Sequence, residues 1–425
     1  MKTIIYSLQL SLLLFAAMGC KKDKGFVHDN NAPVVIDKFT PEAGAAGTEV
    51  LIYGSNFSTD TTGVTVTVNG VKALITGIIS DHILVVIPVK AGTGKVMVSI
   101  NGKTAEGAKD FQYQASYKVT TLAGNGTAGF ADGIGTKALF NFEDRCGLDV
   151  DDEGNLYVAD SKNYSVRKIT PDGTVTTLAG NGEFGYQEGK GDAARFQLPT
   201  DVAVDKDGNV FVSDPFSWAL RKISPDGTTT LIDWVQAWGL GVDKRNGTLY
   251  CVNSTSGKIY QVPPGGSPQE IISGLNNPAD VAVDDQGNLF VTESGSSLIK
   301  KFTAGTWEPA VIAGDASGTG LVNGVGSAAR FEYPWGIAID AQNNLFIAGN
   351  GSKDAPSSNS NQCIRFITAN TWNVSTYIGG TTAGFADGTG AAGLFNVPTG
   401  VAVDKNNTVY VVDRVNNRIR MITSE

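Results

Sequence analysis

The chain has 425 residues, 52 of them glycine, and a formal net charge of −9. This length allows two or three domains. No basic run stands out, which argues against nucleic acid as a partner, because phosphate neutralisation supplies most of that affinity. Short runs of Val, Ile, Thr and aromatic residues alternate with Gly, Asn and Asp, so the chain beyond its N-terminus is predicted to be all-β.

Residues 1–19 are typical of a secretory signal peptide, with a positive start and an apolar run too short to span a membrane. The segment AMGC, which ends at Cys20, resembles a bacterial lipobox, although Ala17 stands where leucine is usual. The resemblance implies cleavage before Cys20 and lipidation of that residue; the alternative is an ordinary signal peptide with an incidental cysteine. Residues 20–32 are polar and are expected to form a flexible lipidated tether.

Residues 33–115 predict a first folded domain. Alternating apolar runs separated by Asn-Gly and other glycine-rich turns indicate about seven short strands, which suits a β-sandwich. The order of features resembles the IPT/TIG family of immunoglobulin-like domains, carried by Phe39-Thr40-Pro41, Gly47-Thr48, the turn 53–57, Val68-Asn69-Gly70, Ile87-Pro88 and the segment 111–113. That family has no shared catalytic site, so the resemblance implies a spacer or a binding surface.

One sequence unit recurs six times after residue 146. Each copy predicts two strands joined by a tight Asp/Gly/Asn turn, followed by a third strand and a fourth. The first halves of the units are at 147–160, 201–214, 239–253, 280–293, 336–349 and 400–413. Six four-stranded units predict a six-bladed β-propeller, and the pattern resembles the NHL repeat family over 117–425.

The sixth unit ends at the C-terminus after only three strands. Residues 118–123 precede the first unit and nearly repeat the fourth strand of that unit, so they are predicted to complete the last blade and to close the ring. The phrase TAGFADG, at 127–133 and 382–388, then lies in two loops that are adjacent around the ring.

The loops between second and third strands and the loops between blades share one face, which we call the long-loop face; the short-turn face is the opposite one. Long loops on a rigid scaffold are where function usually lies. Four glycine-rich inter-blade loops each end in a phenylalanine that is expected to anchor the loop between blades. These residues are Phe140, Phe196, Phe331 and Phe395. These loops do not indicate a phosphate site, since no helix follows them and no Walker-type Lys-Ser/Thr ends them.

The residues just before each first strand are predicted to ring the channel mouth on the long-loop face. They are Cys146, Thr200, Trp238, Ala279, Trp335 and Thr399. Exposed aromatic side chains with polar neighbours suit stacking on sugar rings or peptide side chains. The candidate ligand-binding residues are therefore Trp238, Trp335, Trp218, Phe216, Asp201 and Asp280, the two aspartates as acceptors for hydroxyl groups. The alternative is that the tryptophans pack between blades.

Nothing predicts a catalytic residue, a metal ligand or a cofactor. The two histidines, His28 and His82, precede the propeller, which excludes a Ser–His hydrolase site or a histidine-ligated zinc site on it. Four units carry an acidic residue at the end of the second strand and a basic residue seven positions later, namely Asp160 and Arg167, Asp214 and Arg221, Glu293 and Lys300, and Asp413 and Arg420. These recurring pairs favour internal ion pairs, with a Ca²⁺-binding ring of carboxylates as the alternative. Three further cysteines, Cys146, Cys251 and Cys363, are predicted to be buried free thiols.

The order of lipobox, IPT/TIG domain and NHL repeats, with the aromatic mouth, resembles surface proteins of the Bacteroidota. The resulting hypothesis is an outer-membrane lipoprotein, at the cell surface or on the periplasmic side, whose long-loop face binds carbohydrate. Two alternatives remain. One is a scaffold that binds an envelope protein, and the other is a metal-dependent propeller hydrolase or lyase.

Overall fold

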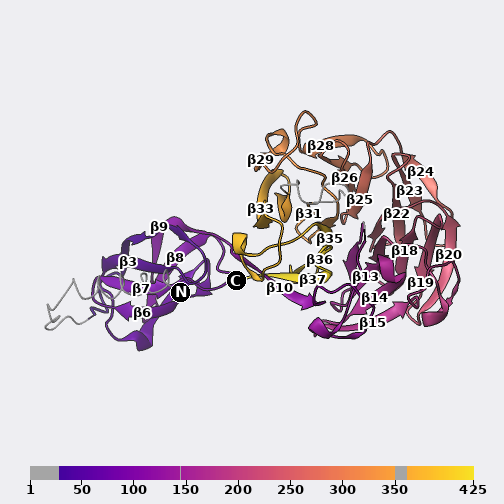
Figure 1. Ribbon diagram of the computed structural model, residues 1–425. Helices are drawn as coiled ribbons and strands as arrows, with labels where there is room; N and C mark the ends of the chain where they lie inside the picture. The colour runs from indigo at the N-terminus through magenta and orange to yellow at the C-terminus, as the bar shows by residue number, and fades with distance from the viewer. Residues whose placement is uncertain (1–27, 144, 350–360) are drawn as a thin grey trace. The chain divides into compact units, whose positions relative to one another are not determined.

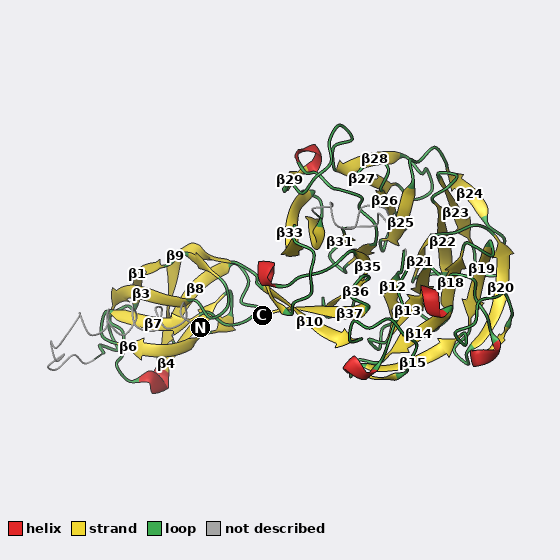
Figure 2. Cartoon of the chain, in the orientation of Figure 1, coloured by secondary structure: helices red, strands yellow, loops and turns green. Residues whose placement is uncertain are grey.

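The computed structural model describes residues 28–143, 145–349 and 361–425 (Figure 1). The signal peptide, Cys20 and most of the tether therefore lie outside the described residues. In these ranges nearly all regular structure is β-strand, with only short 3₁₀ turns besides (Figure 2), which confirms the all-β class. Within the described ranges, no helix reaches the length and hydropathy that crossing a bilayer requires. Two compact units are present: one covers the residues up to Ser116 together with Ser424–Glu425, and the other covers Tyr117–Thr423.

The first unit is a sandwich of two sheets, with strand orders β1-β3-β7-β6 and β2-β9-β8-β4-β5. Along its strands, buried Val and Ile alternate with partly exposed residues, as the period of two in a pleated strand requires. The strands are β1 (Val35–Thr40), β2 (Ala43–Gly44), β3 (Glu49–Ser55), β4 (Val64–Val68), β5 (Val71–Lys72), β6 (Leu74–Ile78), β7 (His82–Val86), β8 (Gly94–Ile100) and β9 (Lys103–Tyr113), with the 3₁₀ turn η1 (Thr61–Gly63) before β4.

The second unit is a propeller of six sheets (Figure 1), and the first strands of neighbouring sheets contact one another around the whole ring. The first three blades, each given from its first strand outward, contain β12 (Leu148–Val150), β13 (Leu156–Asp160), β14 (Ser165–Ile169) and β15 (Thr174–Ala179); β17 (Asp201–Val204), β18 (Val210–Asp214), β19 (Ala219–Ile223) and β20 (Thr228–Trp234); β21 (Gly239–Asp243), β22 (Thr248–Asn253), β23 (Lys258–Val262) and β24 (Gln269–Ile272).

The other three blades contain β25 (Pro278–Val283), β26 (Leu289–Glu293), β27 (Leu298–Phe302) and β28 (Pro309–Ala313); β30 (Ile337–Ile339), β31 (Leu345–Ala348), β32 (Gln362–Thr368) and β33 (Asn373–Gly380); β35 (Pro398–Val403), β36 (Val409–Asp413), β37 (Arg418–Ser424) and β10 (Tyr117–Ala123). Four blades gain a fifth, two-residue strand from a glycine-rich inter-blade loop: β11 (Gly133–Ile134), β16 (Gly189–Lys190), β29 (Gly324–Val325) and β34 (Gly388–Thr389). The remaining 3₁₀ turns are η2 (Gly135–Lys137), η3 (Ser161–Asn163), η4 (Gly191–Ala193), η5 (Gly326–Ala328) and η6 (Gly390–Ala392).

Strand β10 closes the ring. It lies between β34 and β37, so segments from the two ends of the propeller sequence share one sheet. Its Val119 and Ala123 side chains are fully buried in the cores on either side of that sheet. This is the position predicted for residues 118–123 from the sequence. In the structure the strand begins one residue earlier, at Tyr117.

The short-turn face is built by aspartates that open each turn between first and second strands. In the second blade, Oδ1 of Asp205 accepts hydrogen bonds from the N–H groups of Asp207 and Asn209, and its Oδ2 accepts one from Nδ2 of Asn209. The same pattern holds the turns that open at Asp151, Asp284 and Asp340, and at Asp404 the N–H of Thr408 donates to Oδ1 in the same way. These carboxylates therefore serve the turns, as side-chain capping of an Asx turn does elsewhere.

The phenylalanines that end the glycine-rich loops are fully buried, which confirms their predicted structural role; they are Phe140, Phe196, Phe331 and Phe395. An arginine from the third strand of the same blade packs on each ring, for example Arg167 at 5.3 Å from the centroid of Phe140. Arg167 also donates to the carbonyl oxygen of Ala131 and to the carboxylate of Asp132, both within the first TAGFADG. The repeated phrase is thus a docking segment for an arginine of its own blade.

The predicted ion pairs inside the blades occur in three of the four units named for them. Asp160–Arg167, Glu293–Lys300 and Asp413–Arg420 form pairs at 2.7, 2.8 and 2.6 Å. In the second blade the prediction was wrong: Arg221 donates to the carbonyl oxygens of Arg195 and Gln187, and Asp214 accepts from two backbone N–H groups. The three cysteines of the propeller are buried and free, as predicted.

Candidate functional site

The six residues predicted to ring the channel mouth do lie together, around a space of about 10 Å³ at the long-loop end of the channel. Arg145, which precedes Cys146, lines the same space. Its guanidinium carbon lies 4.4 Å from the ring centroids of both Trp238 and Trp335, a cation–π geometry with two partners. A space of this size holds about one water molecule, so the mouth is filled by protein side chains.

This arrangement corrects the predicted aromatic platform at the mouth. Trp335 is only 7% exposed, and Trp238 is partly buried with one ring face on Arg145. The two tryptophans pack on an arginine that the sequence reasoning did not single out. The ring of Trp238 also lies 6.1 Å from that of Phe216, which is 57% exposed, so the accessible aromatic surface begins beside the mouth.

Asp201 and Asp280 are not exposed hydroxyl acceptors at the mouth, which corrects the second part of the prediction. Each carboxylate accepts one backbone N–H from the residue after it and one from the first strand of the next blade. The donors are Val202 and Leu240 for Asp201, and Val281 and Ile337 for Asp280, at 2.8–3.0 Å. Asp149 bridges to Val204 in the same way. These aspartates therefore brace neighbouring blades along the channel wall.

The electrostatics of this pair follow from its surroundings. Loss of hydration in the channel raises the pKa of Asp280 to about 7. It also raises the pKa of Asp201 well above the usual value, and the neighbouring carboxylate of Asp280 adds to that effect. Two carboxyl groups so placed hold a proton at higher pH than isolated aspartates do.

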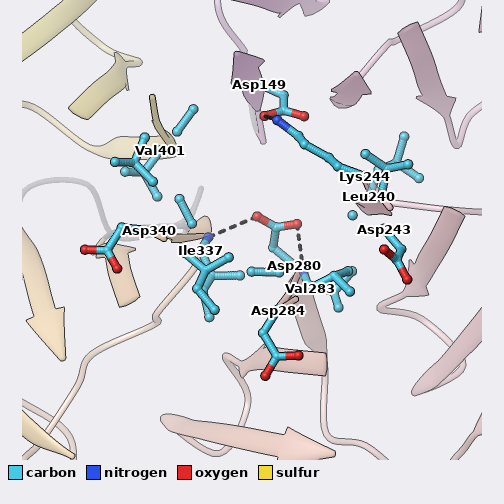
Figure 3. Close-up of a pocket in the computed structure, with 18 of the residues that line it drawn as sticks. Asp149, Leu240, Asp243, Lys244, Asp280, Val283, Asp284, Ile337, Asp340 and Val401 are labelled. Atoms are coloured by element: carbon cyan, nitrogen blue, oxygen red, sulfur yellow. Dashed lines mark hydrogen bonds and ion pairs between the residues drawn. The ribbon is translucent and has the colours of Figure 1, made fainter. Parts of the chain in front are cut away.

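A cavity of about 320 Å³ lies at the short-turn end of the channel (Figure 3). Its walls are mostly Val, Leu, Ile and Ala side chains of the first strands, with Asp280 near its centre in Figure 3. Nζ of Lys244 lies 4.0 Å from the carboxylate of Asp149 and donates to the carbonyl oxygen of Val150. Among the described residues, no three His, Cys, Asp or Glu side chains are grouped so as to hold a metal ion.

A second pocket, which we call the lateral pocket, lies on the long-loop face between the first two blades. Its volume is about 240 Å³, and it is lined by Glu143, Lys162, Tyr164, Phe184, Gln197, Leu198 and Phe216. Phe184 and Phe216 are 61% and 57% exposed, and the rings of Tyr164 and Phe184 meet edge to face at 5.6 Å. Glu143 and Lys162 form an ion pair at its rim.

The predicted site residues thus fall into two groups. Trp238, Trp335, Asp201 and Asp280 line the channel, whereas Phe216 and Trp218 are exposed on the long-loop face. Phe216 joins the mouth to the lateral pocket, and Trp218, 59% exposed, lies in the same turn. Sequence reasoning missed the other lining residues because they come from two inter-blade loops and from a turn of the first blade. One signal was available: the segment SKNYS places Tyr164 at the position that Trp218 holds in PFSWA.

The fold and this site define the class of protein: an IPT/TIG domain followed by an NHL-type propeller with an aromatic long-loop face. Residues 33–113 match the IPT/TIG domain family, and residues 275–302 and 395–420 match the NHL repeat. Over 328 residues the chain is 27% identical to NHL repeat-containing protein 2 of Bos taurus, covering 71% of this chain and 42% of that protein. The chain therefore spans less than half the length of that relative.

Two solved structures from Bacteroides thetaiotaomicron share the fold over most of the chain. One is a structural genomics protein of unknown function, with a TM-score of 0.62 and 21% identity over 94% of this chain and 100% of that one. The other is an auxiliary nutrient binding protein, with a TM-score of 0.59 and 21% identity over 93% and 99% of the two chains. At this level of identity the likeness concerns the fold.

Proposed function

We propose that the protein is a ligand-binding lipoprotein of the outer membrane and that the long-loop face of its propeller binds a glycan. The observation that carries the proposal is the lateral pocket, in which two phenylalanines, Phe184 and Phe216, stay more than half exposed beside an amide and an ion pair. Exposed aromatic rings next to hydrogen-bonding groups suit ligands that have one apolar face and polar edges, as sugar rings do.

The fold-level likeness to an auxiliary nutrient binding protein supports a binding role, which the proposal adopts for this chain. A chain without histidine on its propeller lacks the usual general base, so we expect binding without turnover. Because Glu143 is the single carboxylate among the described residues that line the lateral pocket, we also expect binding that needs no metal ion.

The test is a glycan panel probed with the full chain in detergent, with and without EDTA. We expect one class of glycan to bind equally in both conditions, and Phe216→Ala to lose that binding. Val311→Ala, at a 55% exposed side chain in the outer strand β28, is the matched control and should bind normally. Absence of any glycan signal, with an envelope protein co-purifying, would replace the proposal with a scaffold function. Binding lost in EDTA would point instead to a metal-dependent site.

The membrane anchor is tested separately. We propose that Cys20 carries lipid after cleavage of residues 1–19. Cells grown with a labelled fatty acid should incorporate label into the wild-type protein, and Cys20→Ser should lose the label and leave the membrane fraction. Label that persists in the variant would reject lipidation at this residue. Protease treatment of intact cells then distinguishes the cell surface from the periplasmic side.

A further inference from the structure

The turn between the second and third strands requires one residue with positive φ. Five blades have this turn within the described residues, and the residues at that position, with their φ values, are Tyr164 (48°), Trp218 (58°), Gly257 (67°), Ser297 (55°) and Asn417 (44°). The two aromatic residues belong to the first two blades, between which the lateral pocket lies. Bulky aromatic residues are therefore found at this position beside the pocket, and small ones in the other three blades.

The backbone conformation alone does not favour aromatic residues at this position. A left-handed backbone is disfavoured for residues with a bulky side chain, whereas Gly and Asn adopt it readily. Burial offsets little of the cost at Trp218, which is 59% exposed; Tyr164 is partly buried, and its ring meets that of Phe184, which is 61% exposed. Backbone strain that packing does not repay is typical of binding and catalytic sites.

The lateral pocket has the shape and charge of a site for one neutral ring. Tyr164 and Phe184 contribute aromatic surface from the first blade and its following loop, and Phe216 contributes it from the second. Among the described residues that line the pocket, the charged ones are Lys162 and Glu143, which form an ion pair with each other. A volume of about 240 Å³ is below the usual range for a drug-sized ligand. A charged sugar, such as a uronic acid or a sugar phosphate, would compete with this ion pair.

We propose that the lateral pocket binds one neutral pyranose ring of a glycan, stacked on Phe216 or Phe184, and that Tyr164 is held in a strained turn to complete this subsite. Trp218, two residues from Phe216, extends the aromatic surface for a longer chain. This inference rests on the proposed function and adds the location of the subsite and the class of sugar.

The experiment combines calorimetric titration with thermal unfolding of the full chain in detergent. The probes are neutral gluco-, galacto- and manno-oligosaccharides, with glucuronic acid oligomers and glucose 6-phosphate as charged counterparts. Tyr164→Asn relieves the strained turn, so the melting temperature should be unchanged or higher, while the affinity for a neutral oligosaccharide falls by about tenfold or more. Phe184→Ala should lose affinity to a similar extent. Ser297→Gly, at the same turn position in the fourth blade, is the control and should keep full affinity.

Each other outcome overturns the inference. A melting temperature several degrees lower in Tyr164→Asn would make Tyr164 a structural residue. Unchanged binding in both Tyr164→Asn and Phe184→Ala would place the glycan elsewhere on the long-loop face and leave the proposed function intact. Binding of charged but not neutral saccharides would reject the class of sugar. Failure of every saccharide to bind the wild-type chain would reject both proposals.

Discussion

The guanidinium of Arg167 lies 2.7 Å from the carboxylate of Asp160, and neither side chain is exposed to solvent. The arginine also holds the preceding inter-blade loop, through Ala131 and Asp132, and packs on the buried ring of Phe140. One side chain therefore joins two strands of a blade to the loop that enters it. Arg420 does the same in the sixth blade with Asp413 and Asp387.

Removing this arginine should be costly. In Arg167→Met the carboxylate of Asp160 stays buried without its counter-charge, so the free energy of unfolding should fall by about 3–5 kcal/mol. Urea denaturation followed by circular dichroism measures the change. Lys190→Met, which removes a solvent-exposed partner of Asp226, is the control and should have no measurable effect. Equal effects in the two variants would contradict a special role for the buried pair.

Two phenylalanines of one inter-blade loop are expected to contribute very differently to the free energy of unfolding. Phe196 is fully buried, so Phe196→Ala should lower the free energy of unfolding by about 3–5 kcal/mol through the cavity it leaves. Phe184, twelve residues earlier in the same loop, is 61% exposed, and Phe184→Ala should leave stability nearly unchanged. Both variants are compared by urea denaturation. A large loss of stability in Phe184→Ala would show that its ring is part of the fold.

The raised pKa of Asp280 in the channel should make the free energy of unfolding depend on pH. The pKa of Asp280 is raised to about 7 by loss of hydration, above the unfolded value of about 3.9. The folded chain therefore binds an extra proton in this interval. Its contribution to stability is complete below about pH 4 and is lost as the pH rises toward 7. Asp280→Asn should flatten the fall in unfolding free energy between pH 4 and 7, as measured by urea denaturation at several pH values. An identical pH profile in wild type and variant would show that this carboxyl is not raised.

The sequence was sufficient for features that repeat. Each blade carries the same turn aspartate, the same run of valines and isoleucines and, in four cases, the same loop phenylalanine. A role predicted for a residue in one blade therefore applies to the equivalent residue in the others. Asp205 could be assigned this way because its partners lie in its own turn, and Phe196 because phenylalanine recurs at the same place in four loops. Local chemistry and periodicity decide such positions.

Contacts between side chains of different blades could not be predicted from the repeat pattern. Arg145 reaches Trp238 and Trp335 across the channel, a relationship that depends on the curvature of the ring. Asp201 was expected at an open mouth, yet its second oxygen accepts a hydrogen bond from Leu240 in the next blade. The lateral pocket escaped prediction for the same reason, because loops from two blades meet there.

Closure of the ring by β10 gives a last prediction, about the minimum folded propeller. Val119 and Ala123 are fully buried, and the strand pairs with β34 through Val119↔Gly388 and Lys118↔Thr389. A chain that begins at Tyr117 keeps these contacts and should unfold in one cooperative thermal transition. A chain that begins at Asn125 leaves the edge of β37 unpaired and empties two core positions, so it should unfold at a clearly lower temperature and aggregate more readily. Equal melting temperatures for the two fragments would mean that the ring is stable without its N-terminal strand, and closure would then not be what holds the first and last blades together.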